Sequence, residues 1–110
     1  TLIGGFSQGA MLSCDALLHT DRPYAGLIQL SGTLLASQEW VPLLKKRKGL
    51  PVFQSHGKQD EILPHEGAER LRDTIIHAGL PVEWHSFRGG HEIPRSVLQW
   101  LWPFITKVVT

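Results

Sequence analysis

A serine flanked by glycines stands near the start of the chain, in the segment Gly5-Phe6-Ser7-Gln8-Gly9. The residues after Ser7 are predicted to form a helix, so this serine would occupy a tight turn at a helix start. Such a turn strains the backbone and projects the hydroxyl where it can act as a nucleophile. We expect side chains at Gly5 and Gly9 to collide with neighbours of the turn, so both positions must be small. The motif alone also fits an ordinary glycine-rich turn.

A carboxylate and a histidine follow at two later turns. Asp60 lies in the segment HGKQDEILP (residues 56–64), and His91 lies in GGHEIP (residues 89–94). A histidine can take the proton of a serine hydroxyl, and a carboxylate can orient that histidine. The chain order Ser7, Asp60, His91, with each residue just past a predicted strand, is the order of the α/β-hydrolases. Glu61 and Glu92, which neighbour the proposed acid and base, are the alternative acids.

The elements that position these residues alternate along the chain. Residues 26–32, 50–57 and 80–87 predict strands, being short and apolar with Gly or Pro near their ends. Helices are predicted from residue 8 to about 19, over 64–78 and over 94–109, where Pro103 should kink or split the last one. Residues 33–48 predict a connection followed by a short helix around 39–46. Strands separated by helices indicate a parallel α/β sheet, with ligands at the carboxyl ends of its strands.

Four segments together carry a family resemblance: Gly4-Gly5-Phe6-Ser7-Gln8-Gly9-Ala10, Leu30-Ser31-Gly32, HGKQDEILP and Gly90-His91-Glu92-Ile93. In this order, over nearly the whole chain, they resemble the phospholipase/carboxylesterase family, which includes acyl-protein thioesterases. The resemblance implies Ser7 as nucleophile, Asp60 as acid and His91 as base. It also implies that the Gln8 backbone N–H donates to the oxyanion, and that no metal or cofactor is needed.

Members of that family are about twice as long as this chain by resemblance. We therefore expect the C-terminal half of an α/β-hydrolase fold, a single partial domain over residues 1–110. It would hold three parallel strands with flanking helices, with only residues 1–3 left of the strand before Ser7 and the N-terminal strands absent. The loop that gives the second oxyanion donor would be absent too. An unpaired strand edge would then favour a homo-oligomer or pairing with the missing N-terminal half.

Composition excludes several classes of protein. The 110 residues carry a formal net charge of +1, which lacks the basic footprint of a nucleic-acid binder. The single cysteine, Cys14, excludes an internal disulfide and any multi-cysteine metal site, and its place in an apolar helix predicts packing. No apolar run approaches the ~20 residues of a membrane span. The visible sequence has no signal peptide, and we expect a cytoplasmic location.

The residues and the resemblance together predict a serine carboxylesterase, acyl-thioesterase or lysophospholipase acting on acyl esters or thioesters. Two alternatives stay open: a non-catalytic hydrolase remnant that acts as an oligomerising module, and the C-terminal hydrolase domain of a prolyl-oligopeptidase-type serine peptidase. A metal site formed by His56, His85, His91 and Asp60 fits no compact ligand motif. The histidine at position 56 is instead expected to be structural, in the turn before Gly57.

Overall fold

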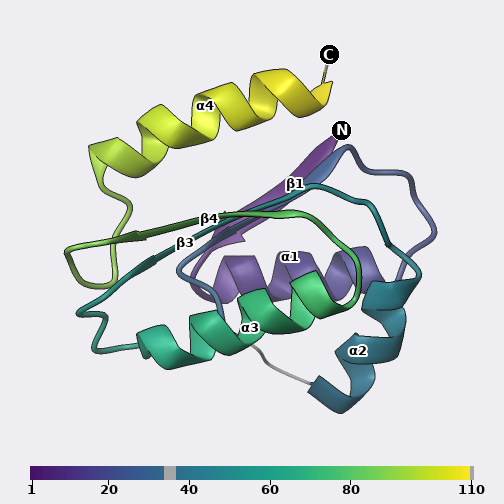
Figure 1. The fold of residues 1–110 in the computed structure, drawn as a ribbon, viewed down its shortest axis with the longest axis horizontal. Coiled ribbons are helices and arrows are strands. Elements are labelled where there is room, and N and C mark those ends of the chain that lie inside the picture. Colours follow the sequence, from purple (N-terminus) through teal and green to yellow (C-terminus); the bar gives the residue numbers. More distant parts are fainter. Residues whose placement is uncertain (34–36, 110) are drawn as a thin grey trace.

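Strands and helices alternate through the computed structural model, which describes residues 1–33 and 37–109 (Figure 1). Residues 34–36, in the predicted connection, lie outside this part. In chain order the elements are β1 (Leu2–Phe6), α1 (Gln8–Leu18), β2 (Gly26–Leu30), α2 (Ser37–Lys45), β3 (Val52–Gly57), α3 (His65–His77), β4 (Val82–Phe87) and α4 (Arg95–Val109). The alternating α/β architecture predicted from the sequence is confirmed.

The described strands form one parallel sheet in the order β1-β2-β3-β4. The sheet has four strands where three were predicted, because β1 runs through Gly4 and Gly5 to Phe6 instead of ending near residue 3. Glycine normally weakens a strand. Here Gly4 allows close pairing, since a Cβ on it would lie 2.5 Å from the Cβ of Ile28 on β2.

The helices cover the two faces of the sheet unequally. Figure 1 shows α4 alone on one face, while α1, α2 and α3 lie on the other. Side chains alternate accordingly along β3, with Val52 packed in the cluster beneath α1–α3 and Phe53 in the cluster beneath α4. Both side chains are fully buried, as expected for a central parallel strand.

The larger core lies between the sheet and the three-helix layer. Cys14 is fully buried in it, which confirms the packing role predicted for this residue. Trp40 of α2 is also fully buried, and its indole N–H donates to the Asp15 carboxylate of α1 over 2.9 Å. This bond satisfies the polar end of the ring and ties α2 to α1.

Helix α4 is continuous from Arg95 to Val109, so Pro103 does not split it; the alternative of a kink stays a prediction. Proline removes the hydrogen bond to the carbonyl four residues earlier, that of Gln99. Both Pro103 and Gln99 are exposed, so this stretch of the helix lies at the surface. Two tryptophans of this helix differ in their surroundings. Trp100 stacks on His85 with ring centroids 4.2 Å apart, whereas Trp102 is 69% exposed.

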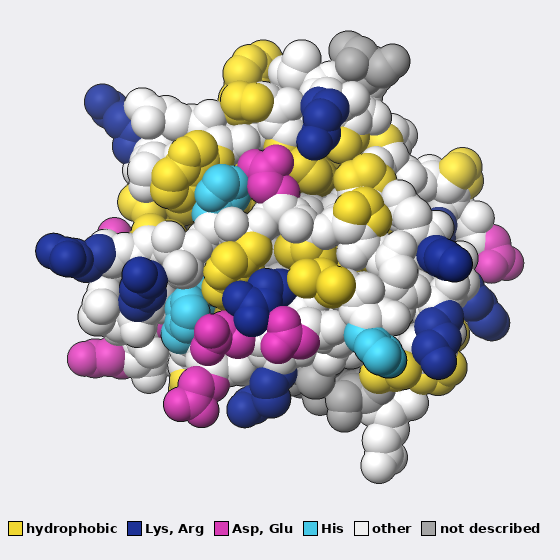
Figure 2. All heavy atoms as spheres, in the orientation of Figure 1, with side chains coloured by type: hydrophobic (Ala, Val, Ile, Leu, Met, Phe, Trp, Pro, Cys, Tyr) yellow, Lys and Arg dark blue, Asp and Glu magenta, His cyan; other side chains and the backbone are white. Residues whose placement is uncertain are grey.

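The surface shown in Figure 2 is charged over one helix and hydrophobic over another. Acidic and basic side chains mix over α3, while hydrophobic side chains lie exposed over α4. The most exposed large apolar residues of α4 are Leu98, Trp102 and Val109, which are more than half exposed. Within the described chain, no helix is both long enough and apolar enough to cross a membrane.

Candidate active site

Ser7 occupies the turn between β1 and α1 in an unusual backbone conformation. Its φ is 58° and its ψ is −120°, a combination that costs a non-glycine residue about 1–3 kcal/mol. Two contacts hold the turn in place. The Ser7 N–H donates to the Leu30 carbonyl of β2 over 2.8 Å, and the Ser7 carbonyl accepts from Ala10 over 3.0 Å. The strain predicted for this position is therefore present and is held from both sides.

The Ser7 hydroxyl does not serve the helix that it precedes. A serine at this N-cap position commonly accepts a hydrogen bond from the first turn of the helix. Ser7 forms no such side-chain bond, and its Oγ instead lies 2.7 Å from His91 Nε2. The backbone bonds of α1 begin with Ala10 and Met11, so the N–H of Gln8 precedes the first of them. The helix start is thus able to offer this N–H to an anion beside Ser7.

The two glycines of the motif differ in what they do. A Cβ on Gly5 would lie 2.6 Å from the carbonyl carbon and oxygen of Gly9, so the turn requires glycine at position 5. A Cβ on Gly9 would meet nothing within 4 Å. The prediction that a side chain at Gly9 would collide with the turn is wrong for the described chain, because this position faces open space.

His91 joins the serine to the carboxylate. Its Nδ1 lies 2.7 Å from Asp60 Oδ2, and its Nε2 faces the Ser7 hydroxyl. The Phe6 ring packs against the imidazole with centroids 4.9 Å apart. Nδ1–H donates to the carboxylate, which leaves the Nε2 lone pair for the serine proton. The structure therefore brings together the three side chains that the sequence singled out.

The Asp60 carboxylate is buried and held by several donors. Its Oδ1 accepts from the N–H groups of Ile62 (2.9 Å) and Leu63 (2.8 Å). Burial raises the pKa of this carboxyl more than any other single influence. The hydrogen bonds from Leu63, His91 and Ile62 together outweigh it and hold the pKa below its ordinary value. The neighbouring Glu61 is exposed and takes no part in this arrangement.

The loops that carry Asp60 and His91 are joined directly. Beyond the last paired residues of β3 and β4, the N–H of Gln59 donates to the Gly89 carbonyl over 2.9 Å. The Gln59 side chain accepts from the Gly89 N–H over 2.7 Å. A Cβ on Gly57 would clash with the carbonyl oxygens of Gly89 and Gly90, so only glycine lets the two loops approach this closely.

Sequence reasoning missed the parts that Gly57 and Gln59 play at this junction. The only signal for them was the position of Gly57 inside the HGKQD segment. The neighbouring His56 is fully buried, and its Nε2 lies 2.6 Å from the Leu63 carbonyl oxygen and 3.2 Å from Asp60 Oδ2. This placement fits the structural role expected for His56 and puts it in contact with the Asp60 loop.

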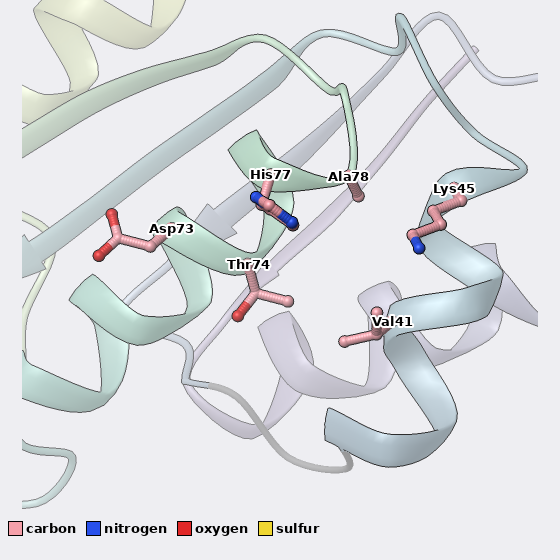
Figure 3. Close-up of a pocket in the computed structure, with 6 residues that line it drawn as sticks. All are labelled: Val41, Lys45, Asp73, Thr74, His77 and Ala78. Carbon is pink, nitrogen blue, oxygen red and sulfur yellow. The ribbon is translucent and has the colours of Figure 1, made fainter.

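A separate hollow of about 350 Å³ lies between α2 and α3, away from these residues (Figure 3). It is lined by Val41, Lys45, Asp73, Thr74, His77 and Ala78. His77, which lines the hollow, is the last residue of α3. His65, whose ring contacts His56 near Asp60, is the first residue of the same helix. The two histidines are about 18 Å apart along the helix axis, so the hollow lies far from Asp60. The hollow contains none of the residues that Ser7 contacts, so we place the chemistry at the strand ends instead.

One group of described side chains is close enough to share a metal ion: Asp15, His19 and Glu39, on α1 and α2. Both ring nitrogens of His19 already have partners, the Asp15 carbonyl at 2.8 Å and the Glu39 carboxylate at 2.6 Å. These contacts join the end of α1 to α2 through hydrogen bonds between protein groups. Ser7, Asp60 and His91 are not part of it.

Residues 1–109 match the sequence model of the Phospholipase/Carboxylesterase family. The chain belongs to this family. Acyl-protein thioesterase 1 of Neurospora crassa is 31% identical over 110 residues, covering 96% of the chain and 45% of that protein. Acyl-protein thioesterase 1 of Eremothecium gossypii is 42% identical over 75 residues, covering 66% of the chain and 31% of that protein. The resemblance drawn from the motifs is confirmed.

Two solved structures show the same fold as this chain. Esterase PE8 superposes with a TM-score of 0.88 at 28% identity, covering 98% of this chain and 50% of that one. SOBER1 of Arabidopsis thaliana superposes with a TM-score of 0.86 at 25% identity, covering 99% and 53% respectively. The described chain is thus a portion of an α/β-hydrolase fold, and it spans about half the length of the first curated relatives that it matches.

Proposed function

We propose that this chain provides the nucleophile, base and acid of a serine hydrolase that cleaves carboxylic esters and thioesters. The observation that carries the proposal is the continuous contact from Ser7 Oγ through His91 to Asp60, with 2.7 Å at each step. The strained turn at Ser7 and the absence of a capping bond from its hydroxyl support it. Membership of the phospholipase/carboxylesterase family supports an ester hydrolase over the peptidase alternative.

The first half of the proposed reaction forms an acyl-enzyme. Ser7 Oγ attacks the carbonyl carbon of the substrate while its proton passes to His91 Nε2. Asp60 keeps Nδ1 protonated and stabilises the imidazolium. The negative charge on the carbonyl oxygen faces the N–H of Gln8 at the start of α1, and an oxyanion donor typically contributes about 100–1000-fold in rate. The tetrahedral intermediate then expels the alcohol or thiol, which takes the proton from His91.

The second half of the reaction releases the acyl group. A water molecule gives a proton to His91 Nε2 as its oxygen attacks the acyl carbon, and Ser7 leaves with that proton. The product is a free carboxylic acid. These three side chains supply each proton transfer and the nucleophile that the cycle needs.

The proposed substrates are acyl esters, acyl thioesters and lysophospholipids. Two relatives bear the name acyl-protein thioesterase, and one solved neighbour is named an esterase. Esters and thioesters share the acyl carbonyl on which the proposed chemistry acts. They differ in the leaving group, which is an alcohol for an ester and a thiol for a thioester.

Hydrolysis of a chromogenic acetyl ester and of an acyl thioester by the purified chain tests the proposal. We expect turnover that disappears in Ser7→Ala and falls steeply in His91→Ala. Ser96→Ala is the matched control, since Ser96 lies on α4 and Ser7 is the serine whose hydroxyl faces His91. A folded chain that hydrolyses neither substrate would contradict the proposal and favour the non-catalytic remnant.

We further propose that the open edge of β1 pairs with another strand in the working protein. The outer edges of the described sheet are β1 and β4. Strand β4 carries Glu83 and His85, and charged or bulky groups discourage unwanted pairing. Strand β1 reads LIGGF and has no charge. The exposed apolar residues of α4 give a second surface that a further part of the protein would cover.

The partner strand would come from the remainder of a longer chain or from a second copy. Relatives about twice as long support the first source, and the uncharged edge suits either. Light scattering across a concentration series separates them: a dimer supports self-pairing, while aggregation relieved by adding the N-terminal half of a relative supports the longer chain. A monomer with a sharp cooperative melt at high concentration would contradict the proposal.

A further inference from the structure

Behind the proposed triad lies a buried histidine that the reaction above does not use. His56 is at the end of β3, its side chain has no exposure to solvent, and its ring faces His65 of α3 at a centroid distance of 5.9 Å. Its Nε2 approaches two oxygen atoms of the Asp60 loop. The Leu63 carbonyl oxygen lies at 2.6 Å and Asp60 Oδ2 lies at 3.2 Å.

These contacts determine which nitrogen of His56 carries the proton. Both atoms near Nε2 are acceptors, so a lone pair on Nε2 would face two oxygens and repel them. Nε2 must therefore carry the hydrogen and donate it to the Leu63 carbonyl. The other nitrogen, Nδ1, is buried and has no hydrogen-bond partner in the described part of the chain. A second proton there would be a buried N–H without an acceptor among the described residues, which is costly.

A neutral His56 with its proton on Nε2 agrees with the electrostatics of the site. Burial lowers the pKa of His56, and this influence exceeds the opposing ones from the Leu63 carbonyl and Asp60. His56 then offers Asp60 a fixed N–H dipole without adding a second positive charge beside His91. No second cation then competes with the His91 imidazolium for the Asp60 carboxylate during the reaction.

The contacts of His56 form a closed ring with those of Asp60. His56 holds the carbonyl of Leu63, and the N–H of Leu63 donates to Asp60 Oδ1 over 2.8 Å. Asp60 Oδ2 lies between His56 Nε2 and His91 Nδ1. The loop from Gly57 to Leu63 is thereby fixed at both ends, at the strand and at the carbonyl that His56 holds.

We infer that His56 is a positioning residue for the triad: its Nε2–H anchors the Leu63 peptide and, through it, fixes the carboxylate of Asp60 against His91. This inference rests on the proposed function for its catalytic meaning and on the geometry for its structural part. His56 itself touches no reacting atom.

Two substitutions at position 56 distinguish the need for an N–H at the place of Nε2 from the need for any polar side chain. Glutamine carries its amide nitrogen three bonds beyond Cβ, as far as Nε2 of histidine, whereas the amide nitrogen of asparagine is one bond shorter. We expect His56→Gln to keep the bond to Leu63 and His56→Asn to lose it. His65→Asn is the matched control, because it alters the ring beside His56 without touching the Asp60 loop.

The readouts are the labelling rate of Ser7 by a fluorophosphonate probe and the pH titration of the Asp60 carboxyl carbon by NMR. In His56→Asn we expect labelling to slow roughly tenfold and Asp60 to titrate about one pH unit higher, the effect of losing one hydrogen bond that holds the Asp60 loop. His56→Gln and His65→Asn should stay within about threefold of the unchanged chain in labelling rate and keep its titration, since each retains the anchor.

Equal behaviour of the Gln and Asn variants in both readouts would overturn the inference, as would NMR detection of the His56 proton on Nδ1. Thermal melts of each variant identify a loss that is only unfolding, and in that case the tautomer of the unchanged chain decides. If the unchanged chain does not label at Ser7, the proposed function fails. The His56 tautomer and the Asp60 titration in the folded variants still judge the positioning role.

Discussion

Replacing Gly5 with alanine should disable Ser7 while leaving most of the fold in place. The added Cβ would lie 2.6 Å from Gly9 backbone atoms, about 0.8 Å inside the 3.4 Å at which ordinary contact begins. Neither partner is a flexible side chain, so α1 must move away from β1 by about this distance. Ser7 lies between them, and a misplacement of ~1 Å in a reacting group can cost about 100-fold in rate. We expect the labelling rate of Ser7 to fall by about that factor.

The other glycine of the motif is the matched control. A Cβ on Gly9 meets nothing within 4 Å, and its φ is not positive. Gly9→Ala should therefore keep the labelling rate and stabilise α1 by about 0.5–1 kcal/mol. Fluorophosphonate labelling followed by mass spectrometry gives the rates, and thermal unfolding gives the stabilities. If Gly9→Ala were as damaging as Gly5→Ala, or if Gly5→Ala kept full reactivity, the steric reasoning would be wrong.

Three further predictions concern other parts of the chain. Gly57→Ala should push the Gly89–Gly90 loop away from Asp60 and lower Ser7 labelling about 100-fold, and an unchanged rate in a folded variant would refute this. Burial, helped by the nearby Asp15 charge, raises the pKa of Cys14 to about 12, so native chain should resist iodoacetamide at pH 8 and react only in urea. The Asp15 carbonyl, and then the Glu39 carboxylate, raise the pKa of His19 above about 6.5. The protonated His19 side chain should therefore contribute its full stabilisation below about pH 6.5 and lose it as the pH rises through the raised pKa. The melting temperature of His19→Gln should differ from that of the unchanged chain at pH 5.5, and the two should converge by pH 9.

The contact between Ser7, His91 and Asp60 was predictable because each of these residues sits in a locally recognisable turn. Ser7 is marked by glycines and a helix start, and Asp60 and His91 each follow an apolar strand. Parallel strands bring their carboxyl ends to one edge, so order along the chain translated into proximity. Strand β1 was underestimated because Gly4 and Gly5 indicate a turn on propensity alone. Only the close approach of Ile28 explains the glycine at position 4.

Features that depend on contact between distant segments could not be predicted. The freedom of Gly9 and the constraint on Gly57 both depend on which backbone lies opposite, and glycine looks the same in either case. The double contact of His56 needs the Leu63 carbonyl to turn back towards the sheet, which no local pattern specifies. Pro103 remained inside α4 at a stretch where both Pro103 and Gln99 are exposed, and only the packed structure shows which side of the helix faces solvent.

The proposed mechanism requires Ser7 to be a nucleophile that His91 activates and Asp60 keeps in orientation. Mapping the fluorophosphonate adduct on the purified, folded chain tests it most directly, since only an activated serine reacts quickly with this probe. We predict a single adduct on Ser7, lost in His91→Ala and strongly slowed in Asp60→Asn. A folded chain that stays unlabelled, or that labels Ser7 equally well without His91, would contradict the claim.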